Sequence, residues 1–187
     1  MSDQVGSDIG GETQRMLGDP DREEQLARMI RVDQAGEYGA VRIYQGQRAV
    51  LKRNAAIKHM EQQEREHLTR FNTLMAQHRV RPTLLQPLWH LAGFALGAGT
   101  ALLGERAAMA CTVAVEDVIE EHYGRQEAAL GEDQAELKAT VQQFRAEEVE
   151  HKNHAIAQGA EQAAAYPVLY TAISAGTKLA IWLSERI

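Results

Sequence analysis

Apolar residues recur every three or four positions over nearly the whole chain from residue 21 onward, which is the repeat of an amphipathic α-helix. Valine, isoleucine and threonine never alternate with polar residues over the length of a strand, so the pattern predicts an all-α fold. Asp19 and Pro20 are predicted to open the first helix as its N-cap and first helical residue. Turn and capping residues divide the chain into six predicted helices, at about residues 20–51, 54–78, 84–103, 105–130, 133–158 and 167–185.

Four of these helices are long and amphipathic, which is the pattern of a four-helix bundle. The other two, at about 84–103 and 167–185, are mostly apolar and are predicted to be additional helices. A chain of 187 residues fits one domain, predicted here for residues 21–187. The acidic, glycine-rich segment 1–20 has the pattern of neither a secretion signal nor a transit peptide. It is predicted to be a disordered tail, which favours a bacterial protein.

Two histidines of the seven follow a glutamate by three residues: Glu64 precedes His67, and Glu148 precedes His151. Residues three apart share one face of a helix. Apolar side chains recur on the same faces, so both motifs are predicted to point into the bundle. A buried carboxylate needs a partner, and both positions are therefore candidates for chemistry.

The other two bundle helices each place one glutamate, Glu37 or Glu116, on an apolar face. These two glutamates lie 79 residues apart and the two Glu-x-x-His motifs lie 84 residues apart, which indicates two similar half-bundles. One glutamate followed by one Glu-x-x-His motif in each half is typical of ferritin-like di-iron and di-manganese bundles. Two divalent ions would balance four buried carboxylates, and oxygen and imidazole ligands suit iron or manganese.

Four segments of the sequence, RVDQAGEYGA (31–40), EREHL (64–68), CTVAVE (111–116) and EEVEH (147–151), resemble the demethoxyubiquinone hydroxylase family. The resemblance extends over about residues 24–187. It implies a ferritin-like domain with two iron ions that cycle between Fe2+ and Fe3+. It also implies that the iron ligands are Glu37, Glu64, His67, Glu116, Glu148 and His151, with the four glutamates as catalytic residues.

The same resemblance implies the reaction. A 5-demethoxyubiquinol hydroxylase is a monooxygenase that inserts one oxygen atom of O2 into the ring of a polyprenylated methoxybenzoquinol during ubiquinone biosynthesis. The expected partners are the polyprenyl benzoquinol, O2 and an external reductant, either NADH or another donor. A homo-oligomer and a complex with a lipid-binding protein of ubiquinone biosynthesis remain open.

Composition narrows the classes of function. A net charge of −6 without a cluster of lysines and arginines argues against a nucleic-acid partner. Cys111 is the only cysteine, which excludes a thiolate zinc site and disfavours a rubrerythrin-like peroxidase. A ferritin-like ferroxidase or iron-storage protein is the main alternative, and a manganese catalase is a second one, because both would use the same ligands.

Residues 84–104 carry no charge and are long enough to span a bilayer. A single crossing would, however, put Glu37 and Glu116 on opposite sides of the membrane. The segment is therefore predicted to be a monotopic anchor, with Trp89 at the interface and the last helix extending the apolar surface. This predicts a peripheral protein on the cytoplasmic side of the bacterial inner membrane. In the alternative interpretation, both apolar helices pack on the bundle or on another subunit.

Metal-binding histidines usually donate a hydrogen bond to a partner outside the metal site. Asp33, one turn before Glu37, and His122 with Tyr123, beyond Glu116, are candidates for this role. His154, one turn after His151, is either another such partner or solvated.

Overall fold

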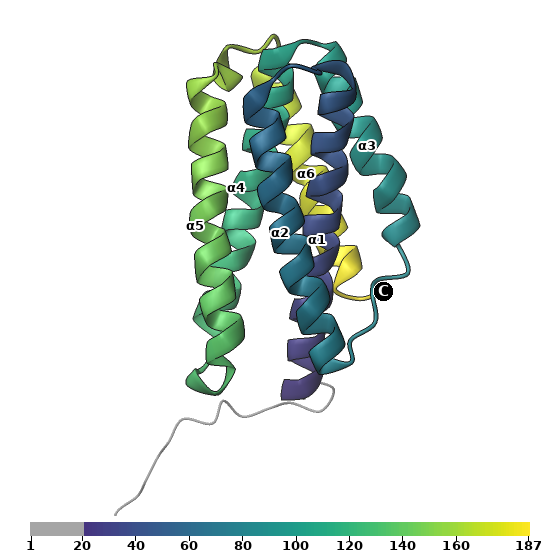
Figure 1. Ribbon diagram of the computed structural model, residues 1–187, viewed down its shortest axis with the longest axis vertical. Coiled ribbons are helices and arrows are strands. Elements are labelled where there is room, and N and C mark those ends of the chain that lie inside the picture. Colours follow the sequence, from purple (N-terminus) through teal and green to yellow (C-terminus); the bar gives the residue numbers. More distant parts are fainter. Residues whose placement is uncertain (1–20) are drawn as a thin grey trace, which may run out of the picture.

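The computed structural model describes residues 21–187, and these form an all-α fold (Figure 1). No strand occurs within this range, so the all-α prediction is confirmed. Two short 3-10 turns, η1 (Glu132–Gln134) and η2 (Ala160–Gln162), lie before α5 and α6. The predicted tail, residues 1–20, lies outside the described residues. The helices are α1 (Arg22–Val50), α2 (Ala55–His78), α3 (Gln86–Leu102), α4 (Glu105–Ala129), α5 (Ala135–Ala157) and α6 (Tyr166–Ser184).

The first helix begins two residues later than the sequence predicts. Asp21 is its N-cap, and the Asp21 carboxylate accepts a hydrogen bond of 2.7 Å from the backbone N–H of Glu24. Such a cap satisfies one of the free N–H groups of the first turn, which fixes Arg22 as the first helical residue. The predicted cap, Asp19, and the proline after it lie outside the described residues.

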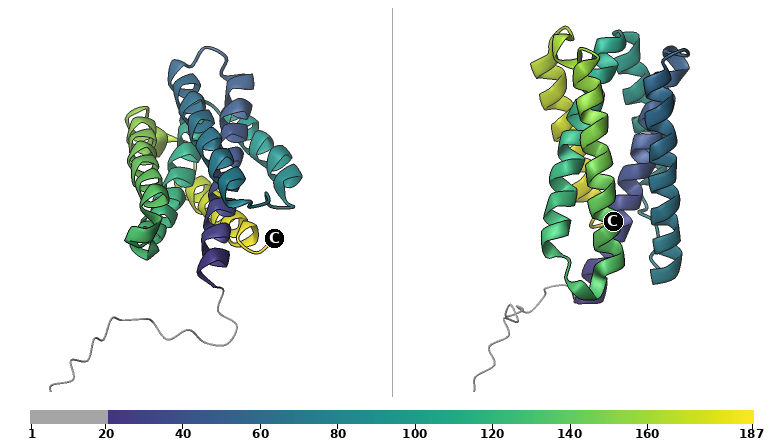
Figure 2. Two further views of the ribbon diagram at one scale, coloured as in Figure 1. Left: turned by 60° about the horizontal axis from the view of Figure 1, so that its bottom comes forward. Right: turned by 60° about the vertical axis from the view of Figure 1, so that its left-hand side comes forward.

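Helices α1, α2, α4 and α5 form the predicted four-helix bundle, and α3 and α6 pack against its outside (Figures 1 and 2). Helix α3 lies along α1, while α6 lies against α4 and also touches α1. The prediction of a ferritin-like bundle with two additional apolar helices is therefore confirmed.

Two apolar clusters fill the bundle, and each of its four helices passes from one cluster to the other. Along α1, for example, Ile30 belongs to the first cluster and Tyr44 to the second, with Glu37 midway between them. The same order holds on α4, where Tyr123 and Met109 lie on either side of Glu116. The buried glutamates of the four helices therefore form a polar band between the two apolar clusters.

Glycines allow α3 to approach α1 closely. A Cβ atom on Gly97 would collide with the backbone carbonyl of Ile43, and one on Gly46 would collide with the carbonyl of Phe94. Two of the glycines that interrupt the apolar segment in sequence, Gly93 and Gly97, are buried against the bundle, so they are packing positions. The close packing of α3 on α1 therefore depends on these glycines.

We expect Gly97→Val to destabilise the protein by at least about 2 kcal/mol, because backbone atoms cannot move aside as a flexible side chain can. The matched control is Gly99→Ala on the same helix, since a Cβ at Gly99 meets no atom within 4 Å. That change should be neutral or stabilise the protein by up to about 1 kcal/mol. Thermal unfolding followed by circular dichroism compares the two variants. Equal stabilities would show that α3 is not held by this contact.

Helices α3 and α6 each bury one face and expose apolar side chains on another. On α3, Leu91 is 69% exposed and Leu102, its last residue, is 75% exposed; on α6, Val168 is 68% and Trp182 51% exposed. Both helices pack on the bundle, as the alternative interpretation predicts, and the monotopic anchor stays a prediction for their apolar outer face. Within residues 21–187, no helix combines the length and the apolar character needed to cross a membrane.

Candidate metal centre

The six predicted ligands come together in the polar band of the bundle. Each of the six is at most 3% exposed. Their oxygen and nitrogen atoms form two overlapping groups, within each of which the candidate ligand atoms lie no more than 4.8 Å apart. Glu64 and Glu148 belong to both groups, so they lie between the two positions that an ion would take. The first group is Glu37, Glu64, His67 and Glu148, and the second is Glu64, Glu116, Glu148 and His151.

Atoms without hydrogen-bond partners show what this cluster is suited to hold. Both carboxylate oxygens of Glu64 lack a partner, as do Oε2 of Glu37, Oε2 of Glu116, Oε1 of Glu148 and Nδ1 of His67. Leaving even one buried polar atom unpaired costs about 1–3 kcal/mol. A set of carboxylate oxygens and imidazole nitrogens meeting at two points fits two hard or borderline divalent cations such as iron or manganese.

The charges of the metal-free cluster are balanced by protons. Burial and the charge of Glu148 raise the pKa of both Glu64 and Glu116 well above the usual range. Burial also acts to raise the pKa of Glu148, but a hydrogen bond with His151 and the charges of His151 and His67 hold it at about 2. Burial acts to lower the pKa of His67 and His151, yet neighbouring carboxylates raise both. Protons therefore occupy the cluster at neutral pH when cations do not.

We expect divalent cations to bind more tightly as the pH rises. The groups with a raised pKa, His67, His151, Glu64 and Glu116, hold protons at neutral pH, and metal ligation must displace those protons. Binding should therefore release protons and weaken toward acidic pH. Calorimetric titration with Co2+ in two buffers of different ionisation enthalpy measures the number released. An affinity that did not change between pH 6 and pH 8 would contradict this charge assignment.

Two buried tyrosines hold Glu37 and Glu116 by hydrogen bonds. The hydroxyl of Tyr123 donates to Oε1 of Glu37, and that of Tyr44 donates to Oε1 of Glu116 over 2.7 Å. Burial and nearby carboxylates raise the pKa of both tyrosines, so the phenols remain neutral donors. Tyr123 was predicted from the sequence as an outer partner, but Tyr44 was not. The signal was present, because Tyr44 follows Glu37 by seven residues just as Tyr123 follows Glu116.

Each histidine of the cluster has an outer partner that sequence analysis did not name. Nε2 of His67 lies 2.6 Å from Oε2 of Glu147, and Nε2 of His151 lies 3.0 Å from Oε1 of Gln63. The signal that could have found them is positional, since Gln63 and Glu147 directly precede the glutamates of the two Glu-x-x-His motifs.

The other predicted outer partners do not contact the histidines of the cluster. Asp33 accepts hydrogen bonds from His122 at 3.1 Å and from Gln126 at 2.7 Å, so Asp33 and His122 pair with each other. His154 is exposed, so the solvated alternative holds for this residue. The prediction that Asp33 and His122 orient His67 or His151 was wrong.

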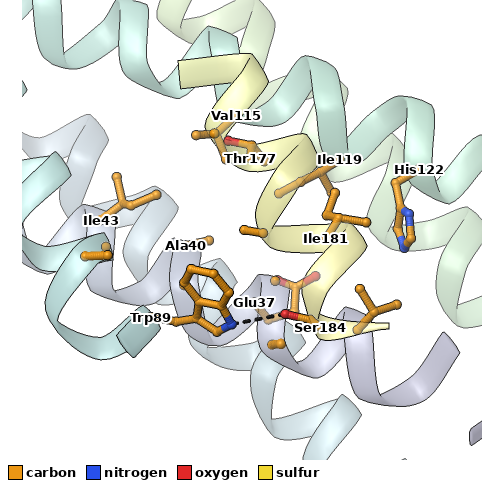
Figure 3. A pocket seen from close by; sticks show the side chains of 18 of the residues that line it. Glu37, Ala40, Ile43, Trp89, Val115, Ile119, His122, Thr177, Ile181 and Ser184 are labelled. Carbon is orange, nitrogen blue, oxygen red and sulfur yellow. Dashed lines mark hydrogen bonds between the residues drawn. The ribbon is translucent and has the colours of Figure 1, made fainter. Parts of the chain in front are cut away.

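An apolar pocket of about 440 Å³ reaches the cluster from the side of α3 and α6 (Figure 3). Glu37 and Tyr123 lie in its wall among mostly small or aliphatic residues of α1, α3, α4 and α6. Trp89, which was predicted as an interfacial anchor, donates its indole N–H to the hydroxyl of Ser184 over 3.0 Å and so ties α3 to α6 beside the pocket. Sequence analysis did not find this pocket.

The chain is similar in sequence to proteins that are named demethoxyubiquinone or demethoxyubiquinol hydroxylases. The chain is 59% identical over 177 residues to a 3-demethoxyubiquinol 3-hydroxylase of Rhodospirillum rubrum, with 92% of this chain and 84% of the relative covered. It is 54% identical to the human NADPH-dependent 3-demethoxyubiquinone 3-hydroxylase, mitochondrial, covering 86% of this chain and 77% of the relative. It is 44% identical to the mitochondrial 5-demethoxyubiquinone hydroxylase of Saccharomyces cerevisiae, covering 87% and 78%.

A family description, ubiquinone biosynthesis protein COQ7, matches residues 24–184. This range contains every residue of the cluster and all six helices except the first two residues of α1. The predicted resemblance is thereby confirmed, and the chain belongs to the COQ7 family of ubiquinone biosynthesis proteins.

Proposed function

We propose that this protein is a di-iron monooxygenase that hydroxylates the ring of a polyprenylated methoxybenzoquinol, demethoxyubiquinol, with O2. One observation carries the proposal: the apolar pocket meets the metal cluster at Glu37. A flat, largely apolar ring can therefore reach the redox site without water around it. Relatives that are 44–59% identical are named hydroxylases of this substrate class.

Reduction of O2 in this reaction takes four electrons. The ring C–H bond supplies two of them, and an external reductant must supply the other two. One oxygen atom of O2 replaces the ring hydrogen as a hydroxyl group, and the other leaves as water after taking up two electrons and two protons. The human relative is named NADPH-dependent. We propose that the electrons come here from NADH, from NADPH, or from a protein that one of them has reduced.

Six side chains would hold the two iron ions. Glu37 and His67 belong to the first position alone, Glu116 and His151 to the second alone, and Glu64 and Glu148 to both. When bound, iron supplies the change between Fe2+ and Fe3+ that reduces O2. Glu64 and Glu148, lying between the two positions, are the carboxylates that can bridge the ions or shift between them. Tyr123 and Tyr44 hold one oxygen each of Glu37 and Glu116 and thereby keep the other oxygen facing the cluster.

The ferroxidase or iron-storage alternative is not favoured. A ferroxidase would use the same six ligands, but its substrate is an ion that needs a polar path. The pocket beside Glu37 offers small and aliphatic side chains from four helices instead. The names of the relatives agree with a hydroxylase.

Isotope labelling tests this function. Iron-loaded protein is incubated with a short-tailed demethoxyubiquinol, a chemical reductant and 18O2. The mass of the product is then measured by mass spectrometry. We expect one labelled oxygen in the ring of the product and no product from the Glu148→Ala variant. If the quinol returned unchanged while Fe2+ was oxidised and retained, the ferroxidase function would replace this one.

We further propose that the exposed apolar face of α3 and α6 rests on a lipid bilayer. The exposed side chains on α3 flank the pocket wall formed by Trp89, Ala92 and Leu96 on the same helix. A substrate with a long isoprenoid tail is dissolved in the membrane, so this arrangement shortens its path to Glu37. In a bacterium the expected surface is the cytoplasmic side of the inner membrane.

Vesicle flotation tests the membrane proposal. We expect the wild-type protein to float with vesicles of phosphatidylethanolamine and phosphatidylglycerol, and the Leu91→Glu/Leu102→Glu variant to stay at the bottom, because each burial of a leucine contributes about 2 kcal/mol. Gel filtration of both proteins without lipid provides the control. If the double substitution changed the oligomeric state and left flotation intact, this face would serve self-association or a lipid-binding partner protein instead.

A further inference from the structure

The side chains that hydrogen bond to the cluster from outside repeat in the two halves of the chain. Glu37 accepts from Tyr123 and Glu116 accepts from Tyr44, so each of these glutamates is held by the tyrosine that follows the other glutamate by seven residues. Tyr44 and Tyr123 are 79 residues apart, as are the two glutamates. The outer partners of the carboxylates are therefore equivalent at both metal positions.

The outer partners of the histidines occupy equivalent places but differ in charge. Gln63 and Glu147 lie 84 residues apart, the same separation as His67 and His151. Each bonds to the histidine of the opposite motif, on the other side of the seam between α2 and α5. One of the two is an amide and the other is a carboxylate, so here the repeat is broken.

This difference acts directly on the metal-binding nitrogens. Both histidines present Nδ1 to the cluster, where it lies 3.2 Å from Oε1 of Glu148 for His67 and 3.0 Å from Oε2 of Glu148 for His151. When Nδ1 of each ring binds an ion, Nε2 carries the proton and donates it outward. A hydrogen bond to a carboxylate is shorter and stronger than one to an amide, in agreement with 2.6 Å at His67 against 3.0 Å at His151.

The carboxylate of Glu147 is also fixed in place. Its second oxygen, Oε1, accepts a hydrogen bond of 2.9 Å from Nε2 of Gln143, one turn earlier on α5. The ring of His67 stacks on Phe144 with the centroids 3.8 Å apart. A negative charge held at Nε2 of an oriented imidazole makes Nδ1 a stronger electron donor to a bound ion.

We propose that Glu147 is a positioning residue that makes the two metal positions unequal. The ion held by Glu37, Glu64, His67 and Glu148 is bound more tightly than the ion held with Glu116 and His151. The tighter position is also the one beside the pocket, since Glu37 lines it. The ring of the substrate therefore meets the more firmly held and more electron-rich ion. This inference rests on the proposed function, because it takes the cluster to be a two-metal site.

Two substitutions that preserve shape test the proposal. Co2+ is titrated calorimetrically into the full-length, metal-free protein, and wild type should show two separate binding steps. Glu147→Gln keeps a hydrogen-bond acceptor and removes the charge, and it should weaken the tight step by about 10–100-fold. Gln63→Glu adds the charge at the equivalent place and should tighten the weak step, so that the two steps converge. Equal weakening of both steps by Glu147→Gln, or no change of the weak step in Gln63→Glu, would overturn the proposal.

A second pair of substitutions identifies which ion is the tight one. Glu37→Gln alters a ligand of the pocket-side position alone, and Glu116→Gln alters its counterpart. We expect the first to weaken the tight step and the second to weaken the weak step, and the reverse order would refute the assignment. Labelled-oxygen turnover by wild type is measured in parallel. If the protein hydroxylates the quinol but binds its two Co2+ ions with equal affinity, this inference alone is wrong. If the two affinities differ but no quinol is hydroxylated, the proposed function alone is wrong.

Discussion

Replacing Glu148 by alanine should remove both metal ions and abolish hydroxylation. Glu148 contacts both histidines of the cluster: its Oε1 lies 3.2 Å from Nδ1 of His67 and its Oε2 lies 3.0 Å from Nδ1 of His151. It belongs to both metal positions. With a pKa of about 2, it is also the carboxylate whose charge is available at any pH at which the protein is studied.

The expected loss of metal affinity in Glu148→Ala can be bounded from the effect of milder substitutions. Substitution of an outer partner of a ligand already weakens metal binding by about 10–100-fold, so loss of a ligand shared by both ions should exceed about 100-fold for each. We expect metal analysis of the purified protein to fall from about two ions per chain to a small fraction of one. Turnover with labelled oxygen should fall below detection.

A matched control lies two residues away on the same helix. Glu150 is exposed, and Glu150→Ala removes the same atoms and the same charge without touching the cluster. It should keep two ions and full turnover, with the same near-ultraviolet circular dichroism as wild type. If Glu148→Ala retained both ions, the cluster would be a buried ion-pair network and not a metal centre.

Helical periodicity alone predicted the bundle and the six side chains that the structure brings together. The reason is geometric, because a residue's place on a helix face follows from its number once the helix exists. Glu37, Glu64, Glu116 and Glu148 stand out since carboxylates are rarely placed on apolar faces. The start of α1 was missed because two residues with good capping chemistry, Asp19 and Asp21, lie close together, and local sequence does not decide between them.

Features that depend on the distance between helices could not be predicted in this way. The outer partners Gln63 and Glu147 lie at the edge of the apolar face, where periodicity indicates solvent, and only the register between α2 and α5 brings them to the histidines. The pocket was missed for a related reason. It exists because small residues on α1 and α6, among them Gly36, Gly39 and Gly176, face each other across a space that no larger side chain fills.

A substitution at Gly36 can block substrate binding while it leaves the metal ligands unchanged. It directly precedes Glu37, it lines the pocket, and a Cβ placed on it meets no atom within 4 Å. A leucine side chain there would project into the space that we propose for the quinol ring. It would also favour the helix, since glycine in a helix interior costs about 1 kcal/mol relative to better helix formers.

We therefore expect Gly36→Leu to lower kcat/KM for the demethoxyubiquinol by at least about 100-fold, because a displacement of about 1 Å in a reacting ring already costs that much. Metal content and thermal stability should remain at or above the wild-type values. Gly36→Ala is the graded control: it fills one methyl group's volume of a pocket of about 440 Å³ and should keep most of the activity. Steady-state kinetics with labelled oxygen, together with metal analysis of the same samples, measures both properties. Unchanged turnover in Gly36→Leu with two ions bound would mean that the quinol reaches the metal centre by another path, and the seam between α2 and α5, which polar side chains cross, would be the next place to block.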